Sequence, residues 1–271
     1  MMNAGLLVVP LYLCAAFAAA CWILSIFTRE FSWVDRLWSI APVLYVAVVA
    51  WRADGRDPRL NLMAVLAAAW GLRLTFNFAR KGGYARGGED YRWTELRRRI
   101  SPALFQVFNV VFICVIQSAL LLAITLPAWI AFQHRGQPLG PLDAIAAVLM
   151  LLFVAGETIA DQQQWRFQSD KRLRQGRGDA VEPGFIRTGL FRYSRHPNFF
   201  CEQAIWWSFY LFGVAAGGGW INLALIGPVT LTALFQGSTQ LTEELSARKY
   251  KAYADYQRRT ARLIPWWPAE P

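Results

Sequence analysis

Long uninterrupted runs of apolar residues constrain this chain of 271 residues more than any other feature. A helix needs roughly 20 apolar residues to cross a bilayer, so runs of this length predict membrane-spanning helices. We place them near residues 5–27, 37–52, 61–79, 104–132, 142–160, 199–216 and 220–238. Only 17% of the residues are charged, whereas a soluble domain carries about a quarter. The sequence therefore predicts an all-α, polytopic integral membrane helix bundle with about seven transmembrane helices.

Residues that break helices occur at two places in or between these runs. The run 104–132 is longer than one bilayer thickness and contains Pro127, which predicts a kink or an end near Leu126. The last two runs are separated only by the glycines at 217–219. We expect a tight hairpin between antiparallel helices there.

The positive charges are concentrated in alternate connections between the runs. Residues 80–99, 166–195 and 248–262 hold 21 of the 28 Lys and Arg residues. Cytoplasmic loops of membrane proteins carry this excess, so the alternation predicts an N-terminus outside and a C-terminus in the cytoplasm. The arginine-containing loop 52–59 falls on the outer side and is the exception. Because topology accounts for the net charge of +10, we expect no nucleic-acid partner.

No repeat, low-complexity tract or long linker divides the chain, so residues 1–271 are predicted to form a single transmembrane domain. Within it, residues 61–241 are expected to form a cofactor-binding helical core. Residues 242–271 are expected to form a cytoplasmic C-terminal helix and tail.

The connection after the third run mixes glycines, arginines, carboxylates and aromatic residues. Residues 80–93 read RKGGYARGGEDYRW. Backbone N–H groups freed by glycine, with arginines beside them, are what a phosphate ligand needs. We predict cofactor contacts from Arg80, Asp90, Tyr91 and Arg92. The alternative is a flexible basic loop lying against anionic lipid headgroups.

A polar patch is predicted at the end of the fifth run. Glu157 and Asp161 lie one helical turn apart, and Gln164 follows three residues on, adjoining Asp161. Carboxylates at a bilayer edge cost free energy unless they meet a cation, a ligand or water. We predict that these side chains contact a cofactor. The alternative is an ion pair with Arg166 or Lys171 at the interface.

The strongest functional signal is the segment 189–202, which reads GLFRYSRHPNFFCE. Its proline fits the first turn of a helix, so Arg195 and His196 lie beside a helix N-terminus. Such a position favours an anion, most naturally a phosphate or a carboxylate. Asn198 and Glu202 are one turn apart on a helix that then becomes apolar. They point together at a ligand or at a neighbouring helix.

Cysteine and histidine usage argues against disulfides and metal. The four cysteines lie in or beside apolar runs without C-x-x-C spacing, which is typical of packing residues. The two histidines form no H-E-x-x-H motif, so we expect no protein-bound metal.

At these residues the chain resembles the membrane superfamily of the steroid 5-alpha-reductases, the sterol C14 and 7-dehydrocholesterol reductases, and the isoprenylcysteine and phospholipid methyltransferases. It is most similar to a bacterial group of small integral membrane proteins related to the steroid 5-alpha-reductase C-terminal domain. The matching pieces are WGLRL at 70–74, GEDYRW at 88–93, ADQQ at 160–163, GLFRYSRHPNF at 189–199, 250–256 and LIPW at 263–266. Residues 1–60 match weakly.

The resemblance implies a seven-helix fold that binds NADPH from the cytoplasmic side and receives a hydrophobic substrate through the bilayer. It implies localisation in a bacterial inner membrane. The implied contacts to NADPH come from Glu157, Asp161, Tyr193, Asn198 and Glu202. Arginines of the loops are implied to hold its phosphates, and planar guanidinium groups suit them. By position these are Arg80, Arg92, Arg187 and Arg195.

The substrate side departs from the steroid enzymes. Their Gln-Glu pair is missing from residues 1–60, and Asn77 lies near the place where their Tyr is expected. Cys201 replaces the second glycine of the motif. Asp35, between two tryptophans near the membrane, is our candidate for the missing acid because such a site raises a carboxyl pKa. Asn77 and Asp35 are thus the predicted catalytic residues; the alternative for Asp35 is an interface anchor with its neighbouring arginine.

The sequence leads to three functional hypotheses. The first is an NADPH-dependent oxidoreductase that reduces a conjugated C=C bond in a steroid-like or other lipophilic substrate, with the cofactor supplying the hydride. The second is an S-adenosylmethionine-dependent membrane methyltransferase of a lipid or isoprenoid. The third is a non-enzymatic lipid-binding protein. In each, the partners are membrane lipids and a lipophilic small molecule.

The C-terminal residues have helical spacing before two prolines. We predict a cytoplasmic helix that caps the cofactor cavity, with Tyr250 as a cofactor contact. The alternative is a surface helix lying on the headgroups.

Overall fold

The protein is all-helical in the part that the structure, a computed structural model, describes. These are residues 5–269, and they contain no strand. Among them, four helical segments are long and apolar enough to cross a membrane, namely Leu7–Thr28, Pro58–Arg80, Pro102–Gln133 and Pro141–Gly176. The predicted class, an all-α protein with membrane-spanning helices, is confirmed.

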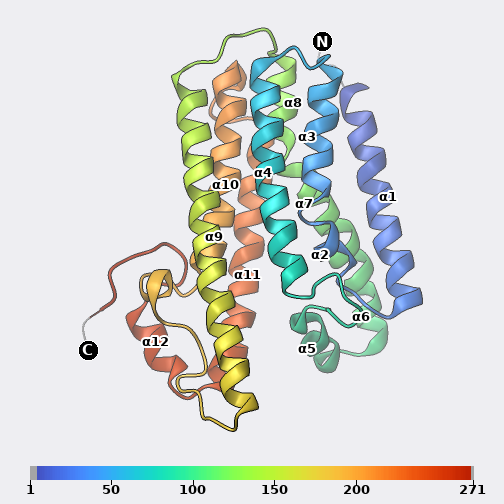
Figure 1. Cartoon of the computed structure of the whole chain (residues 1–271). Helices are drawn as coiled ribbons and strands as arrows, with labels where there is room; N and C mark the ends of the chain where they lie inside the picture. The colour runs from blue at the N-terminus through green and yellow to red at the C-terminus, as the bar shows by residue number, and fades with distance from the viewer. Residues whose placement is uncertain (1–4, 270–271) are drawn as a thin grey trace. The chain divides into compact units, whose positions relative to one another are not determined.

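The chain divides into two compact units. Unit 1 comprises the residues up to 150 together with 206–231. Unit 2 comprises residues 151–205 together with those from 232 onward. The boundaries fall inside α9 (Pro141–Gly176), α10 (Pro197–Gly213) and α11 (Ile226–Lys249), so these three helices contribute to both units (Figure 1).

Unit 1 is built around three neighbouring helices, α1, α3 and α4 (Figure 1). Their bounds are Gly5–Thr28, Ala41–Arg52 and Pro58–Arg80, with the short α2 (Trp33–Leu37) between α1 and α3. A glycine lets α4 approach closely, since a Cβ on Gly71 would lie 2.6 Å from the carbonyl oxygen of Ser39. Beside it, the buried rings of Trp70 and Trp206 meet edge to face with centroids 4.8 Å apart. Large apolar side chains and one close backbone contact therefore fix this packing.

The segment 102–133 is interrupted twice. It runs through α6 (Pro102–Phe108), the π-helix η1 (Asn109–Ile116), α7 (Gln117–Ala123) and α8 (Leu126–Gln133). The break at residues 124–125 confirms the prediction from Pro127, which occupies the first turn of α8, where a missing N–H costs nothing. The π-helix was not predicted. At its start the buried Asn109 donates a 2.9 Å hydrogen bond to Ser25 Oγ of α1, a contact with no local sequence signal.

A buried ion pair accounts for one arginine, Arg59, of the loop 52–59 that did not fit the predicted topology. Arg59 at the start of α4 donates from Nε and Nη2 to the two carboxylate oxygens of Asp143, at 2.7 and 2.9 Å. Both side chains are 2% exposed. Removing one partner of such a pair typically costs about 3–5 kcal/mol because the other charge stays buried. Arg59 is therefore a structural residue of unit 1 and should not be counted as a loop charge.

Unit 2 combines parts of three long helices with the short elements that connect them. It contains the C-terminal part of α9, the 3-10 turn η2 (Gly189–Arg192), the start of α10, the end of α11 and α12 (Tyr253–Arg259). A small core of Ala160, Ile186 and Phe191 holds the connection after α9 against that helix. A second core forms where Phe185 packs against Tyr253 and Tyr256 of α12.

Every predicted span overlaps a helix, but the helices differ in length. The second span, 37–52, is wrong in extent, because α3 has 12 residues and follows the separate α2. The predicted glycine hairpin is also longer than expected. After α10 come the π turn η3 (Val214–Gly218) and the 3-10 turn η4 (Leu223–Leu225), and α11 begins only at Ile226. The count of seven spans and their orientation stay predictions.

Candidate functional site

The candidate site of unit 2 is a set of buried polar side chains where α9 and α10 touch. A Cβ on Gly156 would lie 3.1 Å from Cys201 Sγ, so the two helices approach closely there. Glu157 and Glu202 follow these two residues along the chain and are both 4% exposed. Asp161, one turn beyond Glu157, is 3% exposed. Carboxylates are rarely buried unless they meet polar or charged groups, so this is a polar region inside the fold.

Two amides extend this set. Gln164 follows Asp161 by three residues, and its Oε1 is buried without a hydrogen-bond partner among the described residues. Asn198 precedes Glu202 by one turn of α10 and is half-buried. A buried acceptor without a partner is uncommon and leaves room for an N–H or O–H donor from a ligand.

The connection before α10 is fixed to α9 by a glycine. Gly189 has φ +63°, and a Cβ there would lie 2.5 Å from Gln163 Oε1. The same oxygen accepts a 2.9 Å hydrogen bond from the backbone N–H of Leu190. The turn therefore requires glycine both for its backbone angle and for its contact.

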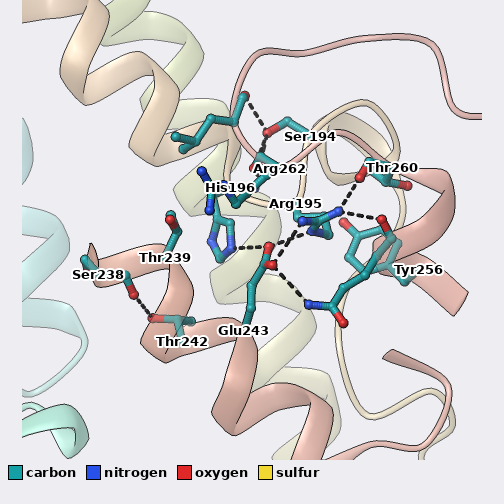
Figure 2. Close-up of polar contacts among 12 residues, drawn as sticks. Ser194, Arg195, His196, Ser238, Thr239, Thr242, Glu243, Tyr256, Thr260 and Arg262 are labelled. Atoms are coloured by element: carbon teal, nitrogen blue, oxygen red, sulfur yellow. Dashed lines mark hydrogen bonds and ion pairs between the residues drawn. The ribbon is translucent and has the colours of Figure 1, made fainter. Parts of the chain in front are cut away.

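Arg195 is held by internal partners (Figure 2). Its Nε and Nη2 donate to the two carboxylate oxygens of Glu243 at 2.6 and 3.0 Å. Its Nη1 donates to the backbone carbonyls of Gln257 and Thr260 at 2.7 and 2.5 Å. The bidentate pair and the two carbonyl bonds use most of the donors of the guanidinium group. Arg195 thus fastens the end of α12 to α11, and its predicted role toward a phosphate stays a prediction.

Glu243 links this contact to the histidine of the motif. His196 is buried, with Nε2 3.1 Å from Glu243 Oε1, and its ring stacks on that of Phe199. Burial acts to raise the pKa of Glu243, but the hydrogen bonds from His196, Arg195 and Gln257 outweigh it and lower the pKa to about 2. Glu243 is therefore ionised at neutral pH and completes a charge-assisted network.

The residue between the tyrosine and the arginine of the motif also holds the C-terminal segment. Ser194 is fully buried and donates from Oγ to the carbonyl of Leu263 at 2.7 Å. Tyr193 accepts at its carbonyl from Trp266 N–H at 2.9 Å, and its ring meets Trp267 edge to face. Sequence reasoning missed Ser194 and Glu243 as parts of this site, because their partners lie roughly 50 to 70 residues away in the chain.

Tyr250 contacts a lysine. Lys171 Nζ of α9 donates to Tyr250 Oη at 2.7 Å and to the Gly184 carbonyl at 2.6 Å. Burial acts to raise the pKa of Tyr250, but the hydrogen bond and charge of Lys171 lower it overall. The structure thus places Tyr250 against a buried cation, and its role as a cofactor contact stays a prediction.

Two arginines of the same connection differ from Arg195. Arg187 is exposed and makes no hydrogen bond or ion pair with any residue in 5–269. Arg192 is exposed at the end of η2, with its guanidinium carbon 6.0 Å from the centre of the Tyr193 ring. These two cations are accessible to an anionic ligand.

In unit 1 the predicted acid Asp35 lies in a compact polar cluster. Its Oδ2 accepts a 3.0 Å hydrogen bond from Trp93 Nε1. Burial raises the pKa of Asp35, and the nearby Asp90 carboxylate raises it further. Asp90 caps α5 (Tyr91–Arg99) and binds the Arg92 guanidinium at 2.5–3.0 Å. Asp90 and Arg92 are therefore paired with each other, while Tyr91 is exposed.

Asn77 and Arg80 also form a pair in unit 1. Asn77 is buried, and its Oδ1 accepts from Arg80 Nε and Nη2 at 3.0 and 2.8 Å. Both predicted residues thus share one contact at the end of α4. Their predicted roles toward substrate and cofactor stay predictions.

The glycine-rich loop after α4 does not leave its N–H groups open for a phosphate. Gly82, Gly83 and Gly88 donate to backbone carbonyls, and Gly87 donates to Glu30 Oε1 at 2.7 Å. Arg36 donates to the loop carbonyls of residues 83 and 85. The prediction that glycine frees these N–H groups is wrong, because the loop uses them to bind itself and the segment around α2.

The predicted residues therefore form two groups, one in each unit. Unit 1 contains Asp35, Asn77, Arg80, Asp90, Tyr91 and Arg92, and unit 2 contains Glu157, Asp161, Gln164, Arg187, Tyr193, Arg195, His196, Asn198, Glu202 and Tyr250. Some members are held by contacts with distant parts of the sequence, such as Asp35 with Trp93 and Arg195 with Glu243, whereas Arg187 is exposed.

Comparison with known proteins assigns the chain to a family. Residues 21–260 match a family described as "Protein of unknown function (DUF1295)". The chain belongs to the DUF1295 family. A protein of Schizosaccharomyces pombe, "Uncharacterized protein C594.04c", is 37% identical over 278 residues, covering 97% of this chain and 80% of the relative. No solved structure matches the chain significantly.

This relative changes one expectation about the family. Because it comes from a eukaryote, a restriction to bacteria is not supported for DUF1295 proteins. The expected bacterial inner membrane is therefore replaced by the broader statement that the chain is an integral membrane protein.

Proposed function

We propose that this DUF1295 protein is a membrane-embedded, NADPH-dependent reductase of a conjugated C=C bond in a steroid-like or other lipophilic substrate. One observation carries the proposal: three carboxylates, Glu157, Asp161 and Glu202, are buried in unit 2 on two helices that approach closely at Gly156 and Cys201. A nucleoside presents several hydroxyl and amide N–H donors, which buried carboxylates accept well. The resemblance of the segments 160–163 and 189–199 to the reductase superfamily points to the same ligand.

The polar groups of unit 2 fit such a cofactor. The buried Oε1 of Gln164 is an acceptor without a partner among the described residues, which suits a carboxamide or hydroxyl donor. The exposed Arg187 and Arg192 supply two positive charges for its phosphates. When bound, NADPH would supply the hydride.

Asp35, in unit 1, is the candidate donor of the proton that the reduced substrate takes up. Burial and the neighbouring Asp90 raise the pKa of Asp35, so this carboxyl group holds its proton at a higher pH than an ordinary aspartate. Trp93 donates to Oδ2 and holds the carboxyl group in place. The Arg80–Asn77 contact would orient Asn77 as a donor to a substrate oxygen.

The proposed topology has seven spans with the C-terminus in the cytoplasm. The basic connections 166–195 and 248–262 would then lie on the cytoplasmic side. NADPH would reach unit 2 from that side, and the substrate would enter from the bilayer.

One observation favours the methyltransferase as a second candidate. Arg195 and Arg92 are occupied by Glu243 and Asp90, so fewer arginines are available for phosphates than the sequence indicates. S-adenosylmethionine carries no phosphate, and its sulfonium would be favoured beside buried carboxylates.

Equilibrium binding to the detergent-purified protein distinguishes the candidates. NADPH should bind and S-adenosylmethionine should not. Glu202→Gln should weaken NADPH binding about tenfold or more, because a charge-assisted hydrogen bond is lost. The exposed Glu244→Gln serves as the matched control. Binding of S-adenosylmethionine alone would establish the second candidate, and binding of neither would reject both enzymes.

The arginines give an independent test. Arg187→Gln and Arg192→Gln should each weaken NADPH binding about fivefold or more at low salt, with little change in affinity for S-adenosylmethionine. Arg177 is an exposed arginine of the same connection, and Arg177→Gln should leave the affinities for NADPH and for S-adenosylmethionine unchanged. Equal effects of all three substitutions would argue against a phosphate site at Arg187 and Arg192.

A further inference from the structure

A groove of about 850 Å³ lies in unit 1, and none of the residues assigned above lines it. Its walls come from the end of α1 and from α6 and η1, through Trp22, Ile26, Val107 and Val111. These four side chains are 42–59% exposed. The buried edge-to-face pair of Phe31 and Phe105 adds to the lining. The volume is within the range of small-molecule sites, and most of the lining is apolar.

Two arginines also line this groove. Arg29 directly follows α1, is exposed, and has no hydrogen-bond or ion-pair partner for its side chain within residues 5–269. Arg97 of α5 lies over the Phe31 ring at 5.3 Å. Its Nη2 forms a long ion pair with Glu89 Oε2 at 4.0 Å, beyond hydrogen-bond distance, and the other oxygen of Glu89 accepts from Phe31 N–H at 2.7 Å. Both cations are therefore accessible to a ligand.

The position of the arginines fits the boundary of a membrane. Candidate spans end at Thr28 and begin at Pro102, so Arg29 and Arg97 lie just outside the two apolar segments. The apolar walls belong to the spans themselves, where hydrocarbon chains would surround them. A molecule that complements this groove has a long apolar chain and an anionic head.

The backbone of this region is specialised as well. Arg29 adopts φ +58°, a conformation that an arginine rarely takes and that glycine would fill at lower cost. Part of the wall belongs to the π-helix η1. Such helices are rare in proteins, and those that occur are often found at functional sites. Both features place side chains at the groove at some cost to local stability.

We propose that this groove binds an anionic phospholipid of the surrounding membrane. Its phosphate would lie between Arg29 and Arg97, and one acyl chain would lie against Trp22, Ile26, Val107 and Val111. The bound lipid would cover the apolar groove, whose lining residues all belong to unit 1.

Native mass spectrometry of the purified protein tests this site with phosphatidylglycerol and phosphatidylcholine of identical acyl chains. Phosphatidylglycerol should bind at least tenfold more tightly. Arg29→Gln and Arg97→Gln should each reduce that preference about fivefold, as expected for one cation near a lipid headgroup, and Arg29→Lys should retain it. Arg98→Gln, an exposed neighbour outside the groove, should have no effect. Equal binding of the two lipids, or equal effects of the 97 and 98 substitutions, would overturn the proposal.

A second pair of variants tests the chain-binding wall without changing charge. Val107→Trp should fill the groove and weaken binding of both lipids. Val115→Trp, at an exposed position of η1 outside the groove, should not. Millimolar inorganic phosphate should fail to displace phosphatidylglycerol. If phosphate displaces it fully, or if Val107→Trp binds lipid like the wild type, the groove is not a phospholipid site.

Discussion

Two connections look alike in the sequence and differ in the structure. Residues 80–93 and 187–196 are both rich in arginine and both predict a phosphate site. In the first, the glycine N–H groups are used internally, and Arg92 is paired with Asp90. In the second, Arg195 is paired, whereas Arg187 stays exposed and without a partner in the described chain. Arginine content alone therefore does not tell whether a cation stabilises the fold or is accessible to a ligand.

The strongest test of this difference removes the carboxylate that holds Arg195. Glu243→Ala should destabilise unit 2 by about 3–5 kcal/mol, because Arg195 and His196 lose their shared partner while staying buried. Thermal unfolding in detergent and proteolysis of the C-terminal segment would measure this loss of stability. The surface pair Arg248–Glu244 gives the control: Glu244→Ala should change stability by less than about 1 kcal/mol. Equal losses in the two variants would remove the structural role assigned to Arg195.

The same network should respond to acid. The pKa of Glu243 is lowered from its usual value of 4.5 to about 2, so its contribution to stability is complete above pH 4.5 and is lost as the pH falls toward 2. About 3 kcal/mol is expected from a shift of this size. The difference in unfolding temperature between wild type and Glu243→Gln should therefore shrink between pH 5 and pH 2. A constant difference over that interval would contradict the assignment.

A pair of arginine substitutions compares the two connections directly. Arg92→Gln should lower stability by about 1–3 kcal/mol, since Asp90 loses a bidentate partner. Arg187→Gln should change stability by less than about 0.5 kcal/mol, as for other surface positions, and should act on NADPH affinity instead. Unfolding and binding measured on the same preparations give both quantities. If Arg187→Gln destabilises as much as Arg92→Gln, the two connections do not differ in the way described here.

An effect on stability similar to that of Arg92→Gln is expected at the glycine of η2. Gly189→Ala combines an unfavourable φ of +63° with a contact to the Gln163 side chain, and should cost about 1–3 kcal/mol. Gly178→Ala has a similar φ of +86° but open space around it, so it shows the backbone cost alone. Thermal unfolding of both variants separates the two effects. A cost for Gly189→Ala no greater than for Gly178→Ala would mean that the Gln163 contact contributes nothing.

Much of the fold could be predicted from local sequence. Every apolar run overlaps a helix, and the break near Pro127 follows from the missing N–H of proline. The length of α3 and the π-helix could not be predicted in this way. They depend on contacts such as Asn109 with Ser25, which lie 84 residues apart in the chain.

The candidate site was predicted in part. Helical spacing placed Glu157 beside Asp161 and Asn198 beside Glu202, and the structure adds the close approach of their helices at Gly156 and Cys201. Helical spacing did not show that Glu243 forms an ion pair with Arg195, or that Asp143 forms one with Arg59. These pairs join residues from separate helices.

The sequence by itself determined that this chain is a helical membrane protein and indicated candidate polar residues, because hydrophobicity and helical spacing are local properties. Only the tertiary structure decided which of its charges are neutralised inside the fold. A charge is buried or exposed according to what packs against it, and that neighbour usually comes from a distant part of the chain. The groove beside Arg29 and Arg97 exists for the same reason, since its walls come from helices that meet only after folding.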